Sequence, residues 1–348
     1  MHDISKKEAG GRRQAANGET WDVVGLRRKI LAWYGKHKRD LPWRRTRDPY
    51  RVWISEIMLQ QTRVAAVIPY FERFLERFPS VAALASAPEQ ELLAAWAGLG
   101  YYSRARNLQS AAQKIRELGS FPREYSSIRS LPGVGDYTAA AIASIAFDLP
   151  HAVLDGNVVR VLSRFTGEPG NVDSVPVRKR LRSVAERMLD PKSSAQFNQA
   201  LMELGALVCL PKQPHCQECP VARQCVAHGM GTQNELPVKS APKGSARVEK
   251  DLLVIERAGK ILFWQRPQEN RRLAGFWELP EPGQVAGAKL GTSIGQFRHT
   301  IVNTNFVCQV FRASLTVVPE GFRWLAKSGI REVPLSTTAK KALACLAD

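Results

Sequence analysis

The chain has no long apolar run and no export signal. No stretch of its 348 residues approaches the roughly 20 consecutive apolar residues that a membrane-spanning helix requires. Residues 1–20 carry Lys6, Lys7, Arg12 and Arg13 but no apolar core of the kind found in secretory signal peptides. We therefore expect a disordered basic tail over residues 1–20, no membrane partner, and a reducing compartment, the cytoplasm of a bacterial cell.

Acidic residues are scarce relative to basic ones. The chain has 50 Lys and Arg against 32 Asp and Glu, which gives a formal net charge of +18. Ten of the basic residues lie between Arg27 and Arg51, a range in which the acids are Asp40 and Asp48. This excess predicts a polyanionic partner, although charge alone does not distinguish DNA, RNA and a membrane surface. We expect about half of these ten side chains to face phosphates, because binding surfaces rarely use every charge.

Strand-like patterning is almost absent before residue 230. From Trp21 to Met230, apolar residues recur at three- and four-residue spacing between Pro, Gly and Ser breaks, which predicts short helices. Residues 231–250 are rich in Pro, Gly, Ser and Lys and are predicted to form a linker. Later runs of β-branched and aromatic residues predict strands, and Thr338–Leu346 is predicted to be helical. We therefore expect a mostly α domain over 21–230 and a smaller α+β domain over 251–348.

Cysteine is also rare, but four of the six cysteines lie close together in one polar loop. Six, two and five residues separate successive members of this group, which comprises Cys209, Cys216, Cys219 and Cys225. Four thiolates on one loop can bind a single inorganic centre, either zinc or an iron–sulfur cluster. Unrelated free thiols and a disulfide are less consistent with a polar loop in a reducing compartment. Cys308 and Cys345 lie in apolar segments and are predicted to pack in a core.

A glycine-bearing turn precedes an apolar helix. The triplet Gly133, Val134 and Gly135 leads into a predicted helix over Ala139–Phe147, and another helix is predicted over Arg123–Arg129. Glycines let main-chain N–H groups approach an anion, and the N-terminus of the following helix adds a positive dipole. We predict a helix–hairpin–helix that binds a backbone phosphate without reading bases. An ordinary Pro-Gly turn is the alternative.

Two carboxylates stand in otherwise apolar segments. Asp155 lies at the predicted entry to a helix, where it can cap the first turn and where the helix dipole favours its ionised form. Glu56 is the one charged residue between Val52 and Thr62, and burial of that helix would favour its protonated form. A solvent-facing Glu on an amphipathic helix is the alternative. Together, a neutral acid and an ionised carboxylate fit the cleavage of a glycosidic bond.

These motifs occur together in one family. Residues from about Trp21 to Met230 resemble the helix–hairpin–helix DNA glycosylases that carry a [4Fe–4S] cluster, and within them the adenine DNA glycosylase (MutY) family. Besides the hairpin and the cysteines, the matching segments are Leu41–Arg44, Ser55–Thr62, Gly100–Arg104 and Leu154–Val158. Tyr137 stands where the related endonuclease III enzymes have a lysine that attacks the sugar. The resemblance therefore implies a monofunctional glycosylase.

The resemblance implies a base-excision-repair enzyme that flips adenine out of double-stranded DNA and hydrolyses its N-glycosidic bond. The adenine is mispaired with 8-oxoguanine or guanine. Glu56 is then the general acid, and Asp155 stabilises the oxocarbenium ion or forms a covalent intermediate. Tyr137 and Asn157 orient Asp155 or the sugar.

The same resemblance implies the binding residues. Trp43 and Arg44 line the adenine pocket, and Gln61 and Tyr101 enter the duplex. Backbone contacts come from the hairpin triplet and from Lys212. The four clustered cysteines hold one [4Fe–4S] cluster, and we expect a monomer that associates with the nucleoid through DNA.

Residues 251–348 resemble the MutT-like (Nudix-fold) domain of the same family, on Ala274–Pro280 and Pro334–Thr337. Hydrolases of that fold need a helix with several glutamates, and Pro282 and Gly283 prevent one, so no pyrophosphatase activity is expected. In the family this domain recognises 8-oxoguanine through a Phe-Ser-His triplet. Here that triplet is replaced by Ile301-Val302-Asn303, which follows His299 and Thr300. We expect these residues to recognise the lesion with weaker discrimination against guanine.

Two other functions stay open at this point. One is an endonuclease III-like enzyme that acts on oxidised pyrimidines, against which Tyr137 and the second domain argue. The other is a non-catalytic DNA-binding protein in which the metal cluster is only a structural support. Glu56 and Asp155 argue against this second alternative.

Overall fold

The computed structural model describes residues 21–348 apart from 242, 243, 245, 268, 270–272, 302, 347 and 348. The tail predicted over residues 1–20 lies outside the described residues. The chain divides into two compact units, of which the first joins Met1–Arg39 to Ala143–Ser240 and the second joins Asp40–Ile142 to Ala241–Asp348. Both units therefore draw on the segment 21–230, predicted as one domain.

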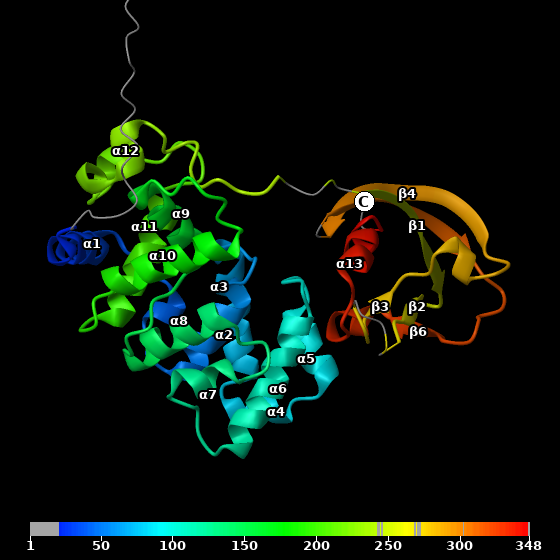
Figure 1. Ribbon diagram of the computed structural model, residues 1–348. Helices are drawn as coiled ribbons and strands as arrows, with labels where there is room; N and C mark the ends of the chain where they lie inside the picture. The colour runs from blue at the N-terminus through cyan, green and yellow to red at the C-terminus, as the bar shows by residue number, and fades with distance from the viewer. Residues whose placement is uncertain are drawn as a thin grey trace, which may run out of the picture. The chain divides into compact units, whose positions relative to one another are not determined.

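Helices build the first unit, as expected from its sequence periodicity (Figure 1). They are α1 (Val23–His37), α9 (Gly156–Thr166), α10 (Val175–Met188), α11 (Ser194–Leu207), α12 (Val226–Met230) and the 3-10 turns η2 (Cys216–Glu218) and η3 (Ala222–Gln224). The helix α8 (Asp136–Phe147) crosses from the second unit into the first.

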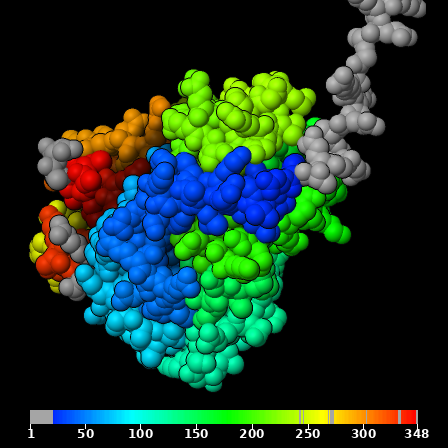
Figure 2. Space-filling model, turned by 90° about the vertical axis from the view of Figure 1, so that its left-hand side faces the viewer, coloured from blue at the N-terminus to red at the C-terminus, as the bar shows by residue number. Residues whose placement is uncertain are grey.

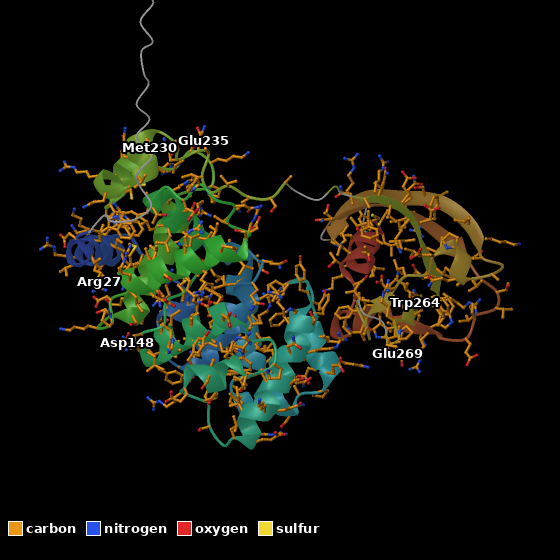
Figure 3. All side chains as sticks on the ribbon, viewed as in Figure 1. Arg27, Asp148, Met230, Glu235, Trp264 and Glu269 are labelled. Carbon is orange, nitrogen blue, oxygen red and sulfur yellow. The ribbon has the colours of Figure 1, made fainter. Side chains whose placement is uncertain are left out.

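The N-terminal helix α1 packs against α10 and α11. Figure 2 shows the blue surface of α1 lying across green surface from these later helices. Arg27, labelled in Figure 3, donates from Nε to the main-chain oxygen of Met188 at 2.9 Å, and so caps the C-terminal end of α10. A cation at this position complements the negative end of the helix dipole.

The segment predicted as a linker is partly bound to the first unit. Val172 donates its main-chain N–H to the oxygen of Val238 at 2.9 Å, and Arg164 Nε donates to the oxygen of Leu236 at 2.9 Å. The strand β1 begins at Ala246, before the predicted end of the linker at residue 250. The linker prediction is therefore too long at both ends.

Helices also build the first part of the second unit. In chain order they are η1 (Pro42–Arg44), α2 (Pro49–Leu59), α3 (Val64–Arg77), α4 (Val81–Ser86), α5 (Glu89–Trp96), α6 (Ser103–Glu117) and α7 (Tyr125–Arg129). Their core is aromatic: Phe74 packs edge to face against Trp96, and Trp53 is fully buried. No helix in the described part of the chain is long and apolar enough to cross a membrane.

The C-terminal part of the second unit, as far as its residues are described, is a mixed sheet with one short α-helix. Its strands are β1 (Ala246–Arg257), β2 (Lys260–Gln265), β3 (Trp277–Glu278), β4 (Lys289–Ile301), β5 (Thr304–Ser314) and β6 (Phe322–Ala326). The order is β3-β2-β1-β5-β4, with β6 paired to β2 and with β1 parallel to β5. The 3-10 turns η4 (Pro282–Gln284) and η5 (Lys327–Glu332) and the helix α13 (Thr337–Ala344) complete it. The predicted terminal helix is therefore confirmed within two residues at each end.

Successive side chains of β1 point to opposite faces of the sheet, and an apolar cluster covers each face. Leu252 and Val254 belong to one apolar cluster, whereas Leu253 and Ile255 belong to the other. In Figure 1 the red helix α13 lies inside the curve of the sheet, against the first cluster. Cys308 is buried there, as predicted.

The C-terminal part contacts the helices of the same unit through α13 and the loop before β3. The rings of Tyr102 and Phe276 lie 4.0 Å apart between centroids, and Lys340 Nζ donates to the oxygen of Ala97 at 3.3 Å. Arg106 Nη2 donates to the oxygen of Ala274 at 2.5 Å. These contacts reach the region from the end of α5 to the start of α6, so the C-terminal part supports the loop between these helices.

Candidate functional site

Glu56 lies in the last turn of α2, a helix whose residues are almost all buried. The helix begins at Pro49, where Asp48 caps the main-chain N–H of Tyr50 at 3.0 Å. Glu56 itself is 5% exposed, so the solvent-facing alternative is wrong. Tyr137 Oη donates to Glu56 Oε2 at 2.7 Å. The predicted acid is therefore buried and held by a phenol.

Tyr137 reaches Glu56 from the predicted hairpin, which the structure contains as α7, a turn and α8. Gly133 has φ +73°, and a Cβ atom there would lie 2.7 Å from Asn107 Cβ, so glycine is required on two grounds. Arg129 Nη1 holds the turn through the oxygen of Val134 at 2.9 Å. The main-chain N–H of Val134 donates to the oxygen of Leu131 at 3.1 Å and so closes the turn. Phosphate binding by the hairpin triplet stays a prediction, for which Gly133 and Gly135 are exposed.

Asp155 caps α9, as predicted. Its Oδ1 accepts from the main-chain N–H of Val158 at 2.7 Å, and its Oδ2 accepts from Asn157 Nδ2 at 2.9 Å. Burial nevertheless raises the pKa of the Asp155 carboxyl above its ordinary value, and these hydrogen bonds and the charge of Arg160 offset that effect only in part. Burial is therefore a larger influence on the pKa of this carboxyl than the helix N-terminus and the two donors, an influence that the sequence-based expectation of an ionised carboxyl did not include.

Arg160 joins the start of α9 to the cysteine loop. Its Nη2 donates to Asn157 Oδ1 at 2.9 Å and to the oxygen of Gly205 at 2.7 Å, while its Nε donates to the oxygen of Cys209 at 2.7 Å. Sequence analysis assigned no role to Arg160. The available signal was a basic residue inside the apolar run Val158–Leu162, which required a polar partner once that helix was buried.

The four predicted metal ligands line one cavity. Cys209, Cys216, Cys219 and Cys225 meet there, together with Arg164 of α9, and all four are free thiols. Arg164 Nη1 lies 3.3 Å from Cys209 Sγ, which places a buried cation beside the sulfur atoms. Burial, followed by the neighbouring cysteines, raises the pKa of Cys219 to about 12. Four such thiolates need a bound cation to persist together.

The lining of this cavity supplies four sulfur donors with a buried guanidinium beside them, a donor set that either zinc or an iron–sulfur cluster can use. Among the described residues, no group of three His, Cys, Asp or Glu side chains is arranged to hold a metal ion.

Gln61 and Tyr101 share an unusual backbone conformation. Gln61 follows α2 and has φ +57°, and Tyr101 precedes α6 and has φ +47°. Both are exposed, with 46% of Tyr101 accessible to solvent. Left-handed backbone is unfavourable for such side chains and is frequently stored at functional sites. A role in entering the duplex stays a prediction.

Other predicted residues have more ordinary positions. Trp43 is buried edge to face against Phe71, and Arg44 is half-buried in the same 3-10 turn. Lys212 is exposed in the loop after α11. Among the ten basic residues of the range 27–51, Arg39 binds Glu203 through two nitrogens and Arg45 binds Asp40, so these two are already paired within the protein.

The predicted lesion-recognition residues lie at the tip of the β4–β5 hairpin. Thr300 Oγ1 donates to Asn305 Oδ1 at 2.8 Å, and the main-chain oxygen of Asn303 accepts from Ala246 at 2.8 Å. Ile301 pairs with Thr304 at the end of the ladder, and Val302 lies outside the described residues. Burial lowers the pKa of His299, as does nearby Lys341, so this imidazole is held in its neutral form at neutral pH.

The structure thus assembles the four predicted catalytic residues as two pairs. Glu56 and Tyr137 meet in the second unit, and Asp155 and Asn157 meet in the first. Each pair combines a carboxyl with a neutral hydrogen-bond donor. Such pairs can transfer a proton or stabilise a developing positive charge.

Comparison with known proteins gives a consistent result. Residues 54–187 match the model of the HhH-GPD superfamily base excision DNA repair proteins. An adenine DNA glycosylase of Rattus norvegicus is 37% identical, in an alignment that covers 92% of this chain and 77% of the relative. One from Buchnera aphidicola (strain Bp) is 42% identical over 72% of this chain and 70% of its own length.

Solved structures share the helical fold. A thermostable thymine-DNA glycosylase is 31% identical with a TM-score of 0.55, covering 60% of this chain and 97% of its own. A non-covalent endonuclease III–DNA complex is 21% identical with a TM-score of 0.52, over 61% of this chain and 99% of its own. At that lower identity the second match concerns the fold alone.

Proposed function

Because this chain belongs to the adenine DNA glycosylase family and removes adenine from DNA, we propose that Glu56 and Asp155 carry out the removal. The target nucleotide is first flipped out of the duplex. Glu56 then donates its proton to adenine, at N7, which converts a poor leaving group into a neutral one. The bond between the sugar C1′ and the base nitrogen breaks, and the bonding electrons leave with the base.

Asp155 acts on the sugar that remains. The positive charge that develops there is stabilised by the Asp155 carboxylate, either as an ion pair or as a transient covalent bond, before water attacks. The raised pKa of Asp155 means that its charge is costly in the empty site. A cation forming beside it removes part of that cost, so the carboxylate stabilises the transition state more than the free enzyme. Asn157 fixes the orientation of this carboxylate through its amide.

The observation that carries this proposal is the hydrogen bond from Tyr137 Oη to Glu56 Oε2 at 2.7 Å. It connects a buried acid to the first turn of α8, directly after the hairpin proposed to bind the DNA backbone. Tyr137 has no amine with which to form a Schiff base, so the proposed enzyme is monofunctional. Gln61 and Tyr101 are proposed to enter the duplex, Trp43 and Arg44 to line the adenine pocket, and Lys212 to contact a phosphate.

We propose adenine opposite 8-oxoguanine or guanine as the substrate. The C-terminal α+β part is proposed to be MutT-like and to contact the opposite base through His299, Thr300, Ile301 and Asn303. Because Phe-Ser-His is replaced by Ile-Val-Asn, discrimination against guanine is proposed to be weak. The protein is proposed to act as a monomer on DNA in the cytoplasm.

A single-turnover assay tests the proposal. Duplexes with adenine opposite 8-oxoguanine, guanine and cytosine are compared, and release is expected opposite the first two. Glu56→Gln is expected to lower the rate by about 100- to 10,000-fold, the usual contribution of a positioned general acid. Glu117→Gln, an exposed glutamate at the end of α6, serves as the control and should leave the rate unchanged.

Three results would contradict the proposal. Equal release opposite cytosine would remove the mispair assignment. Release of thymine glycol, or an adduct trapped by borohydride, would favour the endonuclease III-like alternative. Binding of the mispair with no release of adenine at all would favour the non-catalytic alternative.

The cysteine cavity is proposed to hold one [4Fe–4S] cluster, ligated by Cys209, Cys216, Cys219 and Cys225. Bound there, the cluster would supply a rigid, charged centre beneath the loop that carries Lys212. The purified protein is expected to absorb at about 400 nm, as iron–sulfur proteins do. Cys219→Ser is expected to lose that absorbance and its iron, whereas Cys345→Ser, outside the cavity, should keep both. A protein that contains stoichiometric zinc and no iron would contradict this assignment.

A further inference from the structure

Arg104 binds two turns that are far apart in the sequence. Its guanidinium donates hydrogen bonds of 2.6–3.2 Å to five main-chain oxygens, those of Ile57, Met58, Gln60, Leu99 and Gly100. The first three belong to the end of α2 and the turn that follows it. The other two belong to the loop before α6. One side chain therefore connects both segments.

Each of these turns contains one residue in an unfavourable backbone conformation. Gln61 directly follows one bonded carbonyl, and Tyr101 directly follows another, and both have left-handed φ angles. A left-handed tyrosine persists only when its surroundings hold the backbone in place. Arg104 also lies 5.7 Å from the centre of the Tyr101 ring and 5.4 Å from that of Trp96. It thus contacts both the main chain and the side chain of the strained segment.

Burial of the Arg104 guanidinium by itself lowers the stability of the folded protein. Burial lowers the pKa of Arg104 to about 10, Nε is buried without a hydrogen-bond partner, and all five hydrogen bonds go to neutral carbonyls. The C-terminal end of α2 offsets part of the cost, because its dipole attracts a cation. An uncharged residue could fill this space more cheaply. The planar guanidinium reaches both turns at once, because Nη1 donates to the turn after α2 and Nη2 donates to the loop before α6.

We propose that Arg104 is a positioning residue that fixes the spacing between Gln61 and Tyr101, so that both side chains enter the duplex together. The inference rests on the proposed function of these two residues. Flipping requires one group to displace the base pair and another to fill the space that is left. If the turns moved independently, the two events would no longer coincide.

Substitutions that keep or remove the charge test this role. Arg104→Lys retains a cation, but its donors radiate from one nitrogen and reach one turn at a time. Arg104→Gln removes the buried charge and provides a foldable variant if the lysine is not tolerated. Arg116→Lys, at an exposed arginine on the same helix that bonds Ser86, is the control.

The main readout is flipping without chemistry. In a Glu56→Gln background, a duplex with 2-aminopurine at the target position should brighten when the base unstacks. We expect both Arg104 variants to lose most of that signal and the control to keep it. In the Glu56-intact protein, the single-turnover rate on adenine opposite 8-oxoguanine should fall about 100-fold, the cost of a small misplacement.

A double-mutant cycle separates positioning from general folding. If Arg104 acts through the turn of Tyr101, Arg104→Lys combined with Tyr101→Ala should be scarcely slower than Tyr101→Ala alone. Rate losses that multiply, or a full fluorescence signal in both Arg104 variants, would overturn the inference. Absence of adenine release by the unsubstituted protein would instead contradict the proposed function, and the fluorescence arm would still report on Arg104.

Discussion

The surroundings of Glu56 and Asp155 differ in where each carboxyl lies along its helix. Glu56 occupies the last turn of α2, where the helix dipole opposes a negative charge, and it accepts a hydrogen bond from the phenol of Tyr137. Asp155 occupies the N-cap of α9, where the dipole favours that charge and where Val158 and Asn157 donate to it. The same chemical group is thus placed at opposite ends of two buried helices.

This difference shows that two opposing influences set the protonation state of each carboxyl. Helix ends and donors favour one protonation state, whereas burial always favours the neutral one. At Asp155 burial exceeds the hydrogen bonds, so position at a helix N-terminus does not by itself decide the charge. Which carboxyl acts as the acid and which as the ion therefore depends on how far burial outweighs the helix end and the hydrogen-bond donors at each site.

Of the effects that separate the two carboxyls, a permanently neutral side chain at position 155 should give the largest. Asp155→Asn preserves the shape and can still accept from Val158, but it offers no charge to the sugar. We expect the single-turnover rate to fall about 100- to 1,000-fold, as when a group that stabilises transition-state charge is removed. Asp173→Asn, at an exposed aspartate that accepts from Ser240, is the matched control. A rate within threefold of the unsubstituted protein would mean that the charge of Asp155 is not used.

A smaller effect is expected at the other carboxyl when its donor is removed. Tyr137→Phe deletes the hydrogen bond to Glu56, and we expect the maximal rate to fall about tenfold. The measurement is the single-turnover rate on adenine opposite 8-oxoguanine. Tyr50→Phe, which breaks a 2.7 Å bond from the same helix to Phe78, controls for stability. An unchanged rate would show that the phenol does not act on the acid.

The decline of the rate at low pH tests the raised pKa of Asp155 directly. Because the pKa of Asp155 is raised, we expect activity to fall at a pH above the ordinary aspartate value of 3.8 as the pH is lowered. The measurement is the single-turnover rate across a pH series in which folding is monitored in parallel. A profile that stays flat down to 3.8 would contradict the effect of burial.

The smallest effect concerns stability. The folded protein binds a proton at Asp155 more readily than the unfolded chain, so this group contributes less to the free energy of unfolding as pH rises through the raised pKa. Asp155→Asn should therefore change that free energy by no more than about 1 kcal/mol at neutral pH. Denaturant unfolding at several pH values should show that the free energy of the variant, relative to that of the unsubstituted protein, increases as pH rises through the raised pKa. A relative free energy that decreases over this range would mean that the carboxyl is stabilised by its charge.

Local features of the site were predictable from the sequence. Asp155 was identifiable because a cap, a turn and an apolar helix follow one another, and Glu56 because it is alone in an apolar run. The glycines of the hairpin were identifiable because their conformations are determined by neighbouring residues. In each case the residues that determine the structure are adjacent in the chain.

Features that depend on distant partners were not predictable. The carbonyls that Arg104 binds at the end of α2 lie 44–47 residues away, and Arg160 binds Cys209 across 49 residues. The hydrogen bond between Val238, in the predicted linker, and Val172 could not be predicted for the same reason. The boundary between the two units was equally hidden, because it runs through the continuous helix α8.

The first unit is assembled from two stretches that synthesis produces at different times. α1 leaves the ribosome early, yet Arg27 finds its partners at the end of α10, about 160 residues later. Until then the nascent helix has no surface to cover its apolar side, and the intervening helices can collapse before it docks. In a protein truncated anywhere before residue 188, the apolar side of α1 therefore stays exposed. We expect cells to bind such fragments with chaperones or degrade them with proteases.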